Sequence, residues 1–209
     1  MKTVFRSRRH HYIKKLGTFL VTAALIAGIA GCGTHTTPIE IRDWYDLHAV
    51  RENLSGSYVL MSDLDSTIAG YAEQADSAAN GGKGWQPIGT SDDPFTGSFD
   101  GQGYKINNLY INRPDEELVG LFGYVGEGGV VKNLGVVNAN VTGDPVGGLA
   151  AENHGTVSSS YFNGNVIGED SVGGLVGFNT GTISDSYSTG SVTGVDDGIG
   201  GWWDRIRAM

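Results

Sequence analysis

VGGLAAENHGTVSSSYFNGNVIGEDS occupies residues 146–171, and VGGLVGFNTGTISDSYSTGSVTGVDDG follows at residues 172–198. A weaker copy that begins VGLFG precedes them at residues 119–145, and a partial copy opens at residues 199–201. Successive copies therefore start 26 or 27 residues apart. Self-similarity with a period of about 20–50 residues is typical of proteins built from stacked repeats.

The residue types within each repeat favour β-strands over helices. Val, Ile, Tyr, Thr and Ser dominate, and apolar residues do not recur at helical spacing. Short β-rich runs, such as 147–151, 156–162 and 165–167, are separated by turns rich in Gly or Asn. Gly adopts the positive φ angles of tight corners without steric cost. We therefore predict an all-β protein, a right-handed parallel β-helix (β-solenoid).

Stacking of the repeats predicts contacts between equivalent residues of adjacent coils. Neighbouring strands of a sheet lie about 4.8 Å apart, so identical positions should form ladders along the axis. Paired Gly residues at equivalent positions should lie at tight corners or at close contacts between coils. We expect Tyr161 to stack on Tyr187, Asn153 on Asn179 and Val146 on Val172, with the Gly pairs at 147–148 and 173–174.

Residues 39–118 precede the repeats and are interpreted as a leader. Asp43 can cap a short helix over residues 44–53, whose apolar residues share one face. The open end of a solenoid is a sheet edge that must be covered, so we predict that this helix caps the N-terminal end. Residues 66–84 show no clear period and are interpreted as a loop, whereas FDGQG at 99–103 indicates a turn between two strands.

The N-terminus has the pattern of a secretory signal. Residues 1–15 carry six Lys and Arg and no acid, and residues 16–30 are uncharged and mostly apolar. The apolar run is shorter than the roughly 20 residues that a transmembrane helix needs. These patterns predict a signal peptide at 1–31 and a small polar tether at 32–38.

The apolar run ends in Ile29, Ala30 and Gly31, which stand directly before Cys32. This segment resembles the prokaryotic lipobox, although Leu is usual where Ile29 stands. The resemblance implies that Cys32 becomes the first mature residue and is acylated; an ordinary signal peptide with a chance Cys is the alternative. Two or more acyl chains hold a protein firmly at a membrane. We therefore expect an exported protein, lipid-anchored to the cell membrane or outer membrane and facing outside the cytoplasm.

The charge of the mature chain is strongly negative. Removal of residues 1–31 takes six of the 14 Lys and Arg and none of the 23 Asp and Glu, which leaves a formal charge of −15. Nucleic-acid binding needs clustered Lys and Arg, so we expect no nucleic-acid partner. Acids also precede each repeat start and should stack along one edge, where calcium could bind, although a solvated turn is the favoured interpretation. This predicted cation edge comprises Asp144, Glu169, Asp170, Asp196 and Asp197.

A short Gly-Leu core recurs in the repeats as GLFG at 120–123 and GLVG at 174–177, with a degenerate copy, GLAA, at 148–151. With these cores the chain resembles proteins that carry the GLUG motif, over roughly residues 39–201. Such repeats occur in large surface and adhesin-like proteins and beside the catalytic domain of some IgA-cleaving metallopeptidases. The resemblance implies a structural repeat that is not itself catalytic.

Motifs for catalysis are absent from the sequence. It contains no HExxH, CxxC or GxSxG, and its only Cys is the lipidation candidate. A carbohydrate-active β-helix enzyme, lyase or glycosidase, remains the alternative, and two or three carboxylates with a Lys or Arg in one groove would favour it. Lys132 is the only Lys or Arg within 119–198, which leaves little lyase chemistry. We therefore predict a non-catalytic, cell-surface structural or adhesive module without a cofactor, whose ligand is a surface glycan or a protein.

Two other features leave alternatives open. Trp85 and Tyr104 could stack on a sugar, but burial under the leader helix is the favoured interpretation. The tail at 202–209 carries two Trp and no GLUG pattern, so it either caps the last coil or marks a truncated array. Truncation is favoured, and it predicts self-association through the open C-terminal coil.

Overall fold

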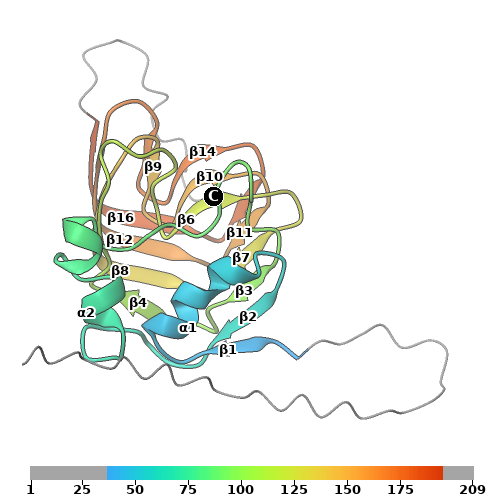
Figure 1. The fold of residues 1–209 in the computed structure, drawn as a ribbon. Helices are drawn as coiled ribbons and strands as arrows, with labels where there is room; N and C mark the ends of the chain where they lie inside the picture. The colour runs from blue at the N-terminus through green and yellow to red at the C-terminus, as the bar shows by residue number, and fades with distance from the viewer. Residues whose placement is uncertain (1–36, 195–209) are drawn as a thin grey trace, which may run out of the picture. The chain divides into compact units, whose positions relative to one another are not determined.

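The computed structural model describes residues 37–194; residues 1–36 and 195–209 lie outside the described part. Short parallel strands wind into a solenoid whose turns, called coils below, stack along one axis (Figure 1). The repeats form the first, second and third repeat coils at residues 120–147, 148–173 and 174–194. The predicted all-β solenoid is confirmed.

Four sheets follow the solenoid axis within the described residues. Sheet A has the order β1 (Ile39–Ile41), β2 (Ser57–Leu60), β3 (Ser98–Asp100), β7 (Val130–Lys132), β11 (Thr156–Ser158) and β15 (Thr182–Ser184). Sheet B contains β4 (Lys105–Asn107), β8 (Gly135–Thr142), β12 (Tyr161–Gly168) and β16 (Tyr187–Gly194), and β5 (Tyr110–Asn112) also pairs with β8. Sheet C contains β6 (Phe122–Val125), β10 (Ala150–Asn153) and β14 (Val176–Asn179), and sheet D contains β9 (Val146–Gly147) and β13 (Val172–Gly173).

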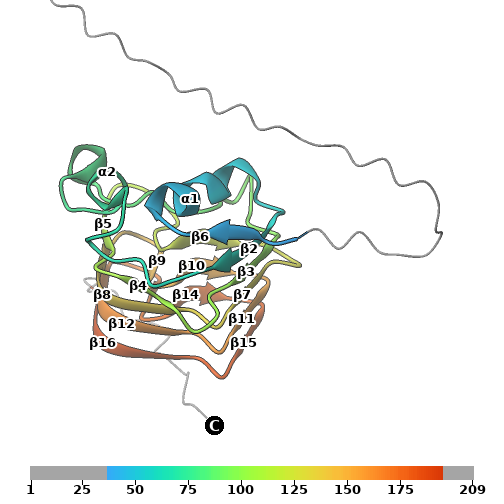
Figure 2. The ribbon, with the colours of Figure 1, turned by 90° about the horizontal axis from the view of Figure 1, so that it is seen from below.

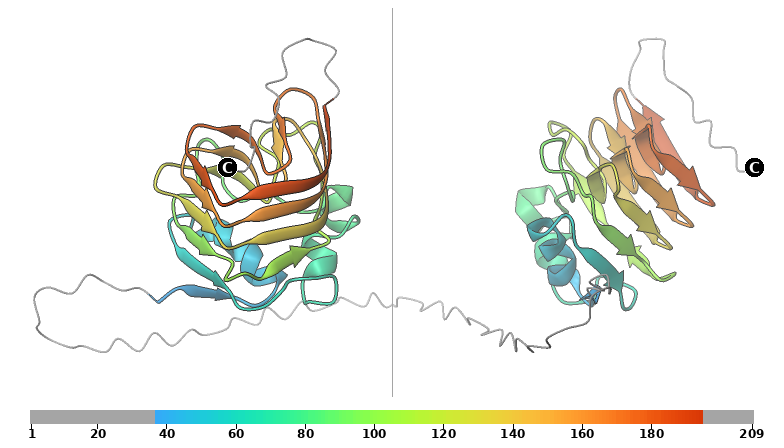
Figure 3. Two further views of the ribbon diagram at one scale, coloured as in Figure 1. Left: turned by 180° about the vertical axis from the view of Figure 1, so that it is seen from behind. Right: turned by 90° about the vertical axis from the view of Figure 1, so that its right-hand side faces the viewer.

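Equivalent residues of successive coils stand in register, as the sequence predicts. Tyr161 pairs with Tyr187, and their rings are nearly parallel with centroids 5.3 Å apart. Asn153 pairs with Asn179 and donates its side-chain amide to the Asn179 amide oxygen at 2.7 Å. The right-hand view of Figure 3 shows the strands of successive coils stacked one behind the next. The pairing of Val146 with Val172 is confirmed in the same way.

The interior of the solenoid consists of columns of apolar side chains. One column on sheet A and two on sheet B are buried through the first two repeat coils, and burial of each such side chain contributes roughly 1.5–3 kcal/mol. Gly147 and Gly173 lie where an added Cβ would meet a backbone carbonyl of the next strand. The columns are Phe99–Val131–Val157–Ile183, Ile106–Val136–Phe162–Ser188 and Ile111–Val141–Val166–Val192.

Part of the leader forms a further coil before the repeats. Ile88 and Phe95 make parallel bridges to Phe122 and Val125 of sheet C, and Val119 bridges Val146. Between these points β3 and β4 continue sheets A and B. Residues 88–119 are called the leader coil. Its chain follows the same path as a repeat coil although it lacks the GLUG core. Pairing between coils therefore depends on the buried positions and not on the motif.

Helix α1 (Trp44–Ala49) lies across the N-terminal end of the stack, opposite β14–β16 (Figure 2). Asp43 caps it by accepting a hydrogen bond from the Asp46 N–H at 2.8 Å, and a 3₁₀ turn (Val50–Glu52) follows. Trp44 and Trp85 are fully buried and pack edge to face, 6.0 Å between centroids. The predicted capping helix and the predicted burial of Trp85 are confirmed.

Two arginines contact Trp85 and stabilise the chain around it. The Arg51 guanidinium lies 4.5 Å above the Trp85 ring, a cation–π contact. Burial, and after it the charge of Arg113, lowers the pKa of Arg51 to about 10, so Arg51 stays charged at neutral pH. Arg113 donates through Nε to the Trp85 carbonyl at 2.8 Å and pairs with Glu116 at 2.6 Å. These bonds join the capping region to the leader coil.

Two details of the leader differ from the predictions. Residues 66–84 contain the short helix α2 (Tyr71–Gln74) and a 3₁₀ turn (Ala79–Gly82), because a single helical turn is too short to show a period in the sequence. Tyr104 is 38% exposed and not buried under α1, since it stands at the start of sheet B on the outside of the solenoid.

Candidate functional site at the corner between sheets A and B

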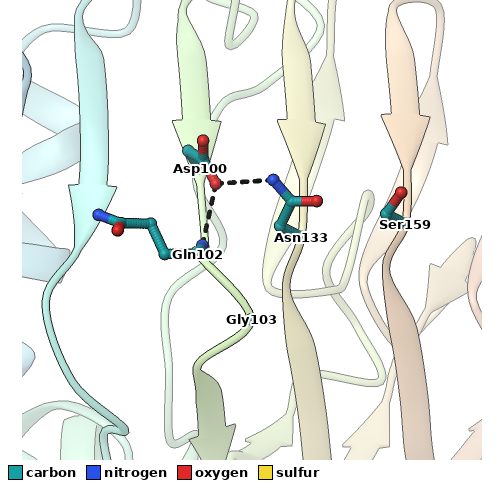
Figure 4. Close-up of a pocket in the computed structure, with 5 residues that line it drawn as sticks. All are labelled: Asp100, Gln102, Gly103, Asn133 and Ser159. Carbon is teal, nitrogen blue, oxygen red and sulfur yellow. Dashed lines mark hydrogen bonds between the residues drawn. The ribbon is translucent and has the colours of Figure 1, made fainter.

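A shallow polar hollow lies where the chain turns from sheet A to sheet B. Its lining residues come from the leader coil and the first two repeat coils (Figure 4). Asn133 and Ser159 stand one coil apart and share a left-handed backbone conformation, with φ of 54° and 47°. Non-Gly residues rarely adopt this conformation, and each costs roughly 1–3 kcal/mol that the surrounding structure must offset. The lining residues are Asp100, Gln102, Gly103, Asn133 and Ser159.

Buried serine side chains stabilise the corner between sheets A and B. The Ser160 hydroxyl accepts a hydrogen bond from the Leu134 N–H at 3.2 Å and donates to the Ser158 carbonyl at 2.8 Å. Ser186 repeats the arrangement one coil later, because its hydroxyl accepts from the Ser160 N–H at 3.1 Å. This ladder satisfies backbone groups that would otherwise be buried without partners, so the corner keeps one geometry from coil to coil.

Asp100 is the central polar group of the hollow. Its carboxylate accepts hydrogen bonds from the Gln102 N–H at 2.9 Å and the Asn133 side-chain amide at 3.0 Å, and Lys132 Nζ lies 3.3 Å away. Burial opposes ionisation, but these hydrogen bonds and the Lys132 charge outweigh it, so the pKa of Asp100 is below its usual value. Asp100 is therefore a fixed, ionised acceptor, and its predicted role as a turn residue is confirmed.

A stacked pair of tyrosines adjoins the hollow on sheet B. Gly135, Tyr161 and Tyr187 occupy the same outward position in three successive coils. A Cβ on Gly135 would lie 2.6 Å from Cζ and Oη of Tyr161, so the tip of that ring covers Gly135. Tyr187 is 50% exposed and parallel to Tyr161. Polar groups and aromatic surface thus meet at this corner.

A second cluster lies beside sheet C, around His154. The imidazole stacks on the Tyr124 ring at 4.6 Å, contacts Glu152 through Nε2 at 3.0 Å and Thr180 through Nδ1 at 2.7 Å. Burial, assisted by the charges of Glu152 and Glu127, raises the pKa of Tyr124. Both imidazole nitrogens already have partners in the protein, so this cluster links coils.

The predicted cation edge is only partly within the described residues. Asp144 and Asp170 stand in adjacent coils, and the Asp144 carboxylate accepts the Asp170 N–H at 2.9 Å. Among residues 37–194 there is no group of three or more His, Cys, Asp or Glu that could hold a metal ion. Glu169 is exposed beside them, and calcium binding stays a prediction. The predicted site residues Ile29, Ala30, Gly31, Cys32, Asp196 and Asp197 lie outside the described part.

Asn133, Ser159 and the tyrosine pair were not predicted as parts of one site. The sequence indicates Asp100 as a turn residue and Tyr161 as a ladder residue, without placing them at the same corner. Asn133 and Ser159 are 26 residues apart, as are Tyr161 and Tyr187. Tracing each polar residue through the repeat period could have found the corner.

In the stretch of the chain that the structure covers, no helix combines the length and the apolar character needed to cross a membrane.

Comparison with known proteins supports the resemblance drawn from the sequence. Residues 168–193 match the GLUG motif, which confirms the motif for that segment. The chain is 37% identical over 175 residues to halomucin of Haloquadratum walsbyi, covering 80% of the chain and 2% of halomucin. It is 35% identical over 133 residues to a protein of Evansella cellulosilytica provisionally named a Gly-rich membrane protein, covering 62% of the chain and 15% of that protein.

The fold is also similar to a solved structure. A Bacteroides ovatus protein, provisionally described as an immunoglobulin A1 protease, superposes with a TM-score of 0.59 at 23% identity. The superposition covers 77% of this chain and 49% of that one. At this identity the likeness establishes the fold alone. The chain spans a small fraction of its sequence relatives and about half of this structural one.

Proposed function

We propose that the chain is a lipid-anchored, non-catalytic module of the cell surface with a structural or adhesive role. The observation that carries the proposal is the in-register stacking of coils. Apolar columns fill the interior, and polar and aromatic side chains repeat on the outside at intervals of one coil. This arrangement offers a long repetitive surface, which suits multivalent contact better than a single reaction centre.

The proposed location rests on the N-terminal sequence and on the names of relatives. A basic segment, an apolar segment and Cys32 follow in the order of a lipoprotein signal. One relative is named as a membrane protein, and the other is named halomucin. Because this chain matches small segments of both, their names support a surface location without assigning their partners to it.

The content of the corner hollow supports a non-catalytic role over a glycosidase or lyase. Such a glycosidase uses two carboxylates on either side of the scissile bond. Asp100 is the only carboxylate among the residues that line the hollow, and it is already engaged by Lys132 and Asn133. The hollow is therefore better suited to holding a ligand than to cleaving one.

Replacement of Cys32 tests the anchor. In cells that produce the full chain, the wild type should sediment with membranes after a high-salt wash, and Cys32→Ser should appear in the soluble or extracellular fraction. Ser is nearly isosteric with Cys, so the fold downstream is not expected to change. If Cys32→Ser stays in the washed membranes, the anchor lies elsewhere.

Attachment of the same cells tests the adhesive role. Cells producing the wild type should adhere to wells coated with glycoproteins more than cells producing Cys32→Ser, in which the module is no longer retained. Equal attachment, with the wild type confirmed at the surface by protease shaving, would leave a structural role and contradict the adhesive one.

A further inference from the structure

The outer face of strands β8, β12 and β16 of sheet B is uncharged, whereas Lys105 of β4 is exposed one coil earlier. Strands β8, β12 and β16 each contain eight residues, and none of these residues is Asp, Glu, Lys or Arg. This absence is unusual in a chain whose mature region carries a formal charge of −15. Protein surfaces normally intersperse charges of both signs, and a neutral face spanning three coils is suited to contact with a neutral partner. We call the outward face of these three strands the sheet B platform.

Aromatic surface forms one margin of the platform. The Tyr161 ring covers Gly135, and Tyr187 continues the stack at 5.3 Å with half of its surface exposed. The pair therefore extends along the solenoid axis and adjoins the corner hollow. Aromatic rings offer a large, rigid contact area at small cost in conformational entropy.

Amides and hydroxyls form ladders over most of the rest of the platform, where the Ile167 side chain is also 42% exposed. The Asn163 amide donates to the Thr189 hydroxyl at 2.9 Å, and the Asn165 amide donates to the Asn140 amide oxygen at 2.9 Å. Each side-chain amide has two donor hydrogens and an acceptor oxygen, so these bonds leave further donors and acceptors toward solvent. The ladder bonds also fix the side chains, which lowers the entropy lost when a ligand binds.

We propose that the sheet B platform binds a neutral, linear glycan that lies along the solenoid axis. This proposal rests on the proposed adhesive function and names its ligand class. Tyr161 covers Gly135 and is stacked on Tyr187, so the apolar C–H face of a pyranose ring packs on the outer, half-exposed face of Tyr187. The sugar hydroxyls exchange hydrogen bonds with the Asn and Thr ladders. Asp100, ionised at the edge of the platform, accepts from a further hydroxyl.

The repeat distance favours a polymer over a single sugar. Coils follow one another at about 4.8 Å, close to the advance of one sugar unit in an extended chain. Successive sugar units therefore meet equivalent groups on successive coils. Because contacts add along the chain, affinity should rise with glycan length. The absence of charge on the platform selects against acidic polysaccharides, whose carboxylates would find no cationic partner there.

Native affinity electrophoresis tests the proposal with defined polymers. The full chain, purified in detergent, is run in gels containing hydroxyethylcellulose, galactomannan or soluble xylan, with polygalacturonate as the anionic comparison. At least one neutral polymer should retard the wild type, and the Tyr161→Ala/Tyr187→Ala variant should lose about tenfold or more in apparent affinity. Tyr45→Ala is the matched control, since Tyr45 is 48% exposed on α1, away from the platform, and should bind as the wild type does.

A second variant tests the same site in case the double mutant does not fold. Gly135→Ala keeps both tyrosines but forces the Tyr161 ring off its position, because the new methyl group would lie 2.6 Å from Cζ. It should weaken retardation while leaving the β-sheet circular dichroism unchanged. Retardation undiminished in both platform variants, or retardation by polygalacturonate alone, would overturn the proposal.

The remaining outcomes separate this proposal from the adhesive function. If no neutral polymer retards the chain while producing cells still attach to coated wells, the glycan proposal fails and adhesion stands. If the wild type self-associates in light scattering and the double variant does not, the platform is an interface between copies of the chain and the glycan assignment is wrong.

Discussion

The two ends of the described solenoid are finished in different ways. At the N-terminal end, α1 covers the coil interior, and Trp44 is fully buried. At the other end, Val192 is 47% exposed, although Val166, in the same position one coil earlier, is fully buried. Valine at the same position of a coil is therefore buried where a further described coil stacks on it, and half-exposed in the last described coil.

The residue types at the two ends also differ. The column Ile106–Val136–Phe162 is apolar until the third repeat coil, where Ser188 takes the position. The capped end instead gathers large aromatic side chains, with Trp44 packed on Tyr71 and Trp85. Each coil depends on its neighbours for burial, so the ends determine how much of the interior contributes to stability.

Removal of the aromatic cap should have the largest effect. Trp44→Ala leaves a cavity against Trp85 and leaves the Asp65 carbonyl without its 3.0 Å hydrogen bond from the indole N–H. We expect a loss of about 3–5 kcal/mol in the free energy of unfolding. Urea denaturation measures it. Tyr45→Ala, at the adjacent exposed position, should cost no more than about 0.5 kcal/mol; equal losses would mean that α1 does not seal this end.

Overpacking of equivalent glycines compares an inner coil with the outer one. A Cβ on Gly148 would meet the Phe162 ring and the Gly174 carbonyl, whereas one on Gly174 would meet the Ser188 hydroxyl. Gly148→Val should therefore cost about 2–3 kcal/mol and Gly174→Val about 1 kcal/mol, both through steric conflict. Thermal unfolding of the two variants gives the order, and a greater loss at Gly174 would contradict the open third coil.

Two valines of one column test the open end directly. Val166→Ala should cost about 1.5–3 kcal/mol, and Val192→Ala less than about 1 kcal/mol, because only the first side chain is fully buried. Denaturation at several protein concentrations is the measurement. Similar losses would show that something covers Val192 in solution, either residues 195–209 or a second copy. Light scattering with and without residues 202–209 would test the predicted self-association. It would also decide between a cap and a truncated array.

A smaller, pH-dependent effect is expected at the capped end. The hydrogen bond from Lys83 lowers the pKa of Glu116, burial opposes this, and Arg113 lowers it further. A depressed folded-state pKa stabilises the protein above the unfolded-state value of about 4.3 and loses this effect as pH falls through the folded value. The free energy of unfolding of the wild type should thus exceed that of Glu116→Gln by less than about 1 kcal/mol at neutral pH, since Glu116 is 38% exposed. This difference should vanish at low pH. Glu117→Gln, which removes a carboxylate at the exposed neighbouring position, is the matched control.

Calcium should have the smallest effect. Asp144 already accepts the Asp170 N–H, and the described residues contain no group of acids arranged around a common point. We expect millimolar calcium to leave the melting temperature of the chelator-treated protein unchanged. A rise in Tm that Asp144→Asn abolishes would restore the predicted cation edge.

The repeats were predictable because their period and their interior are visible in the sequence. Tyr161 and Tyr187 stand 26 residues apart, and parallel stacking follows from that spacing alone. The leader coil was not predicted, because Ile88 and Phe95 join sheet C through single bridges that leave no strand-length pattern. The turn FDGQG was predicted, but its role as a corner between two sheets depends on Lys132 and Asn133 of the next coil.

The direction of the hydrogen bonds between coils has a mechanical consequence. They run along the solenoid axis, so a pull between the two ends would act first on a terminal coil, and the coils would separate in succession. Each repeat that unwound would release 26 or 27 residues, about 90 Å of extended chain, in place of the roughly 4.8 Å that it occupied along the axis. A stack of a few coils would then yield to tension in steps, lengthening many times over before the polypeptide became taut.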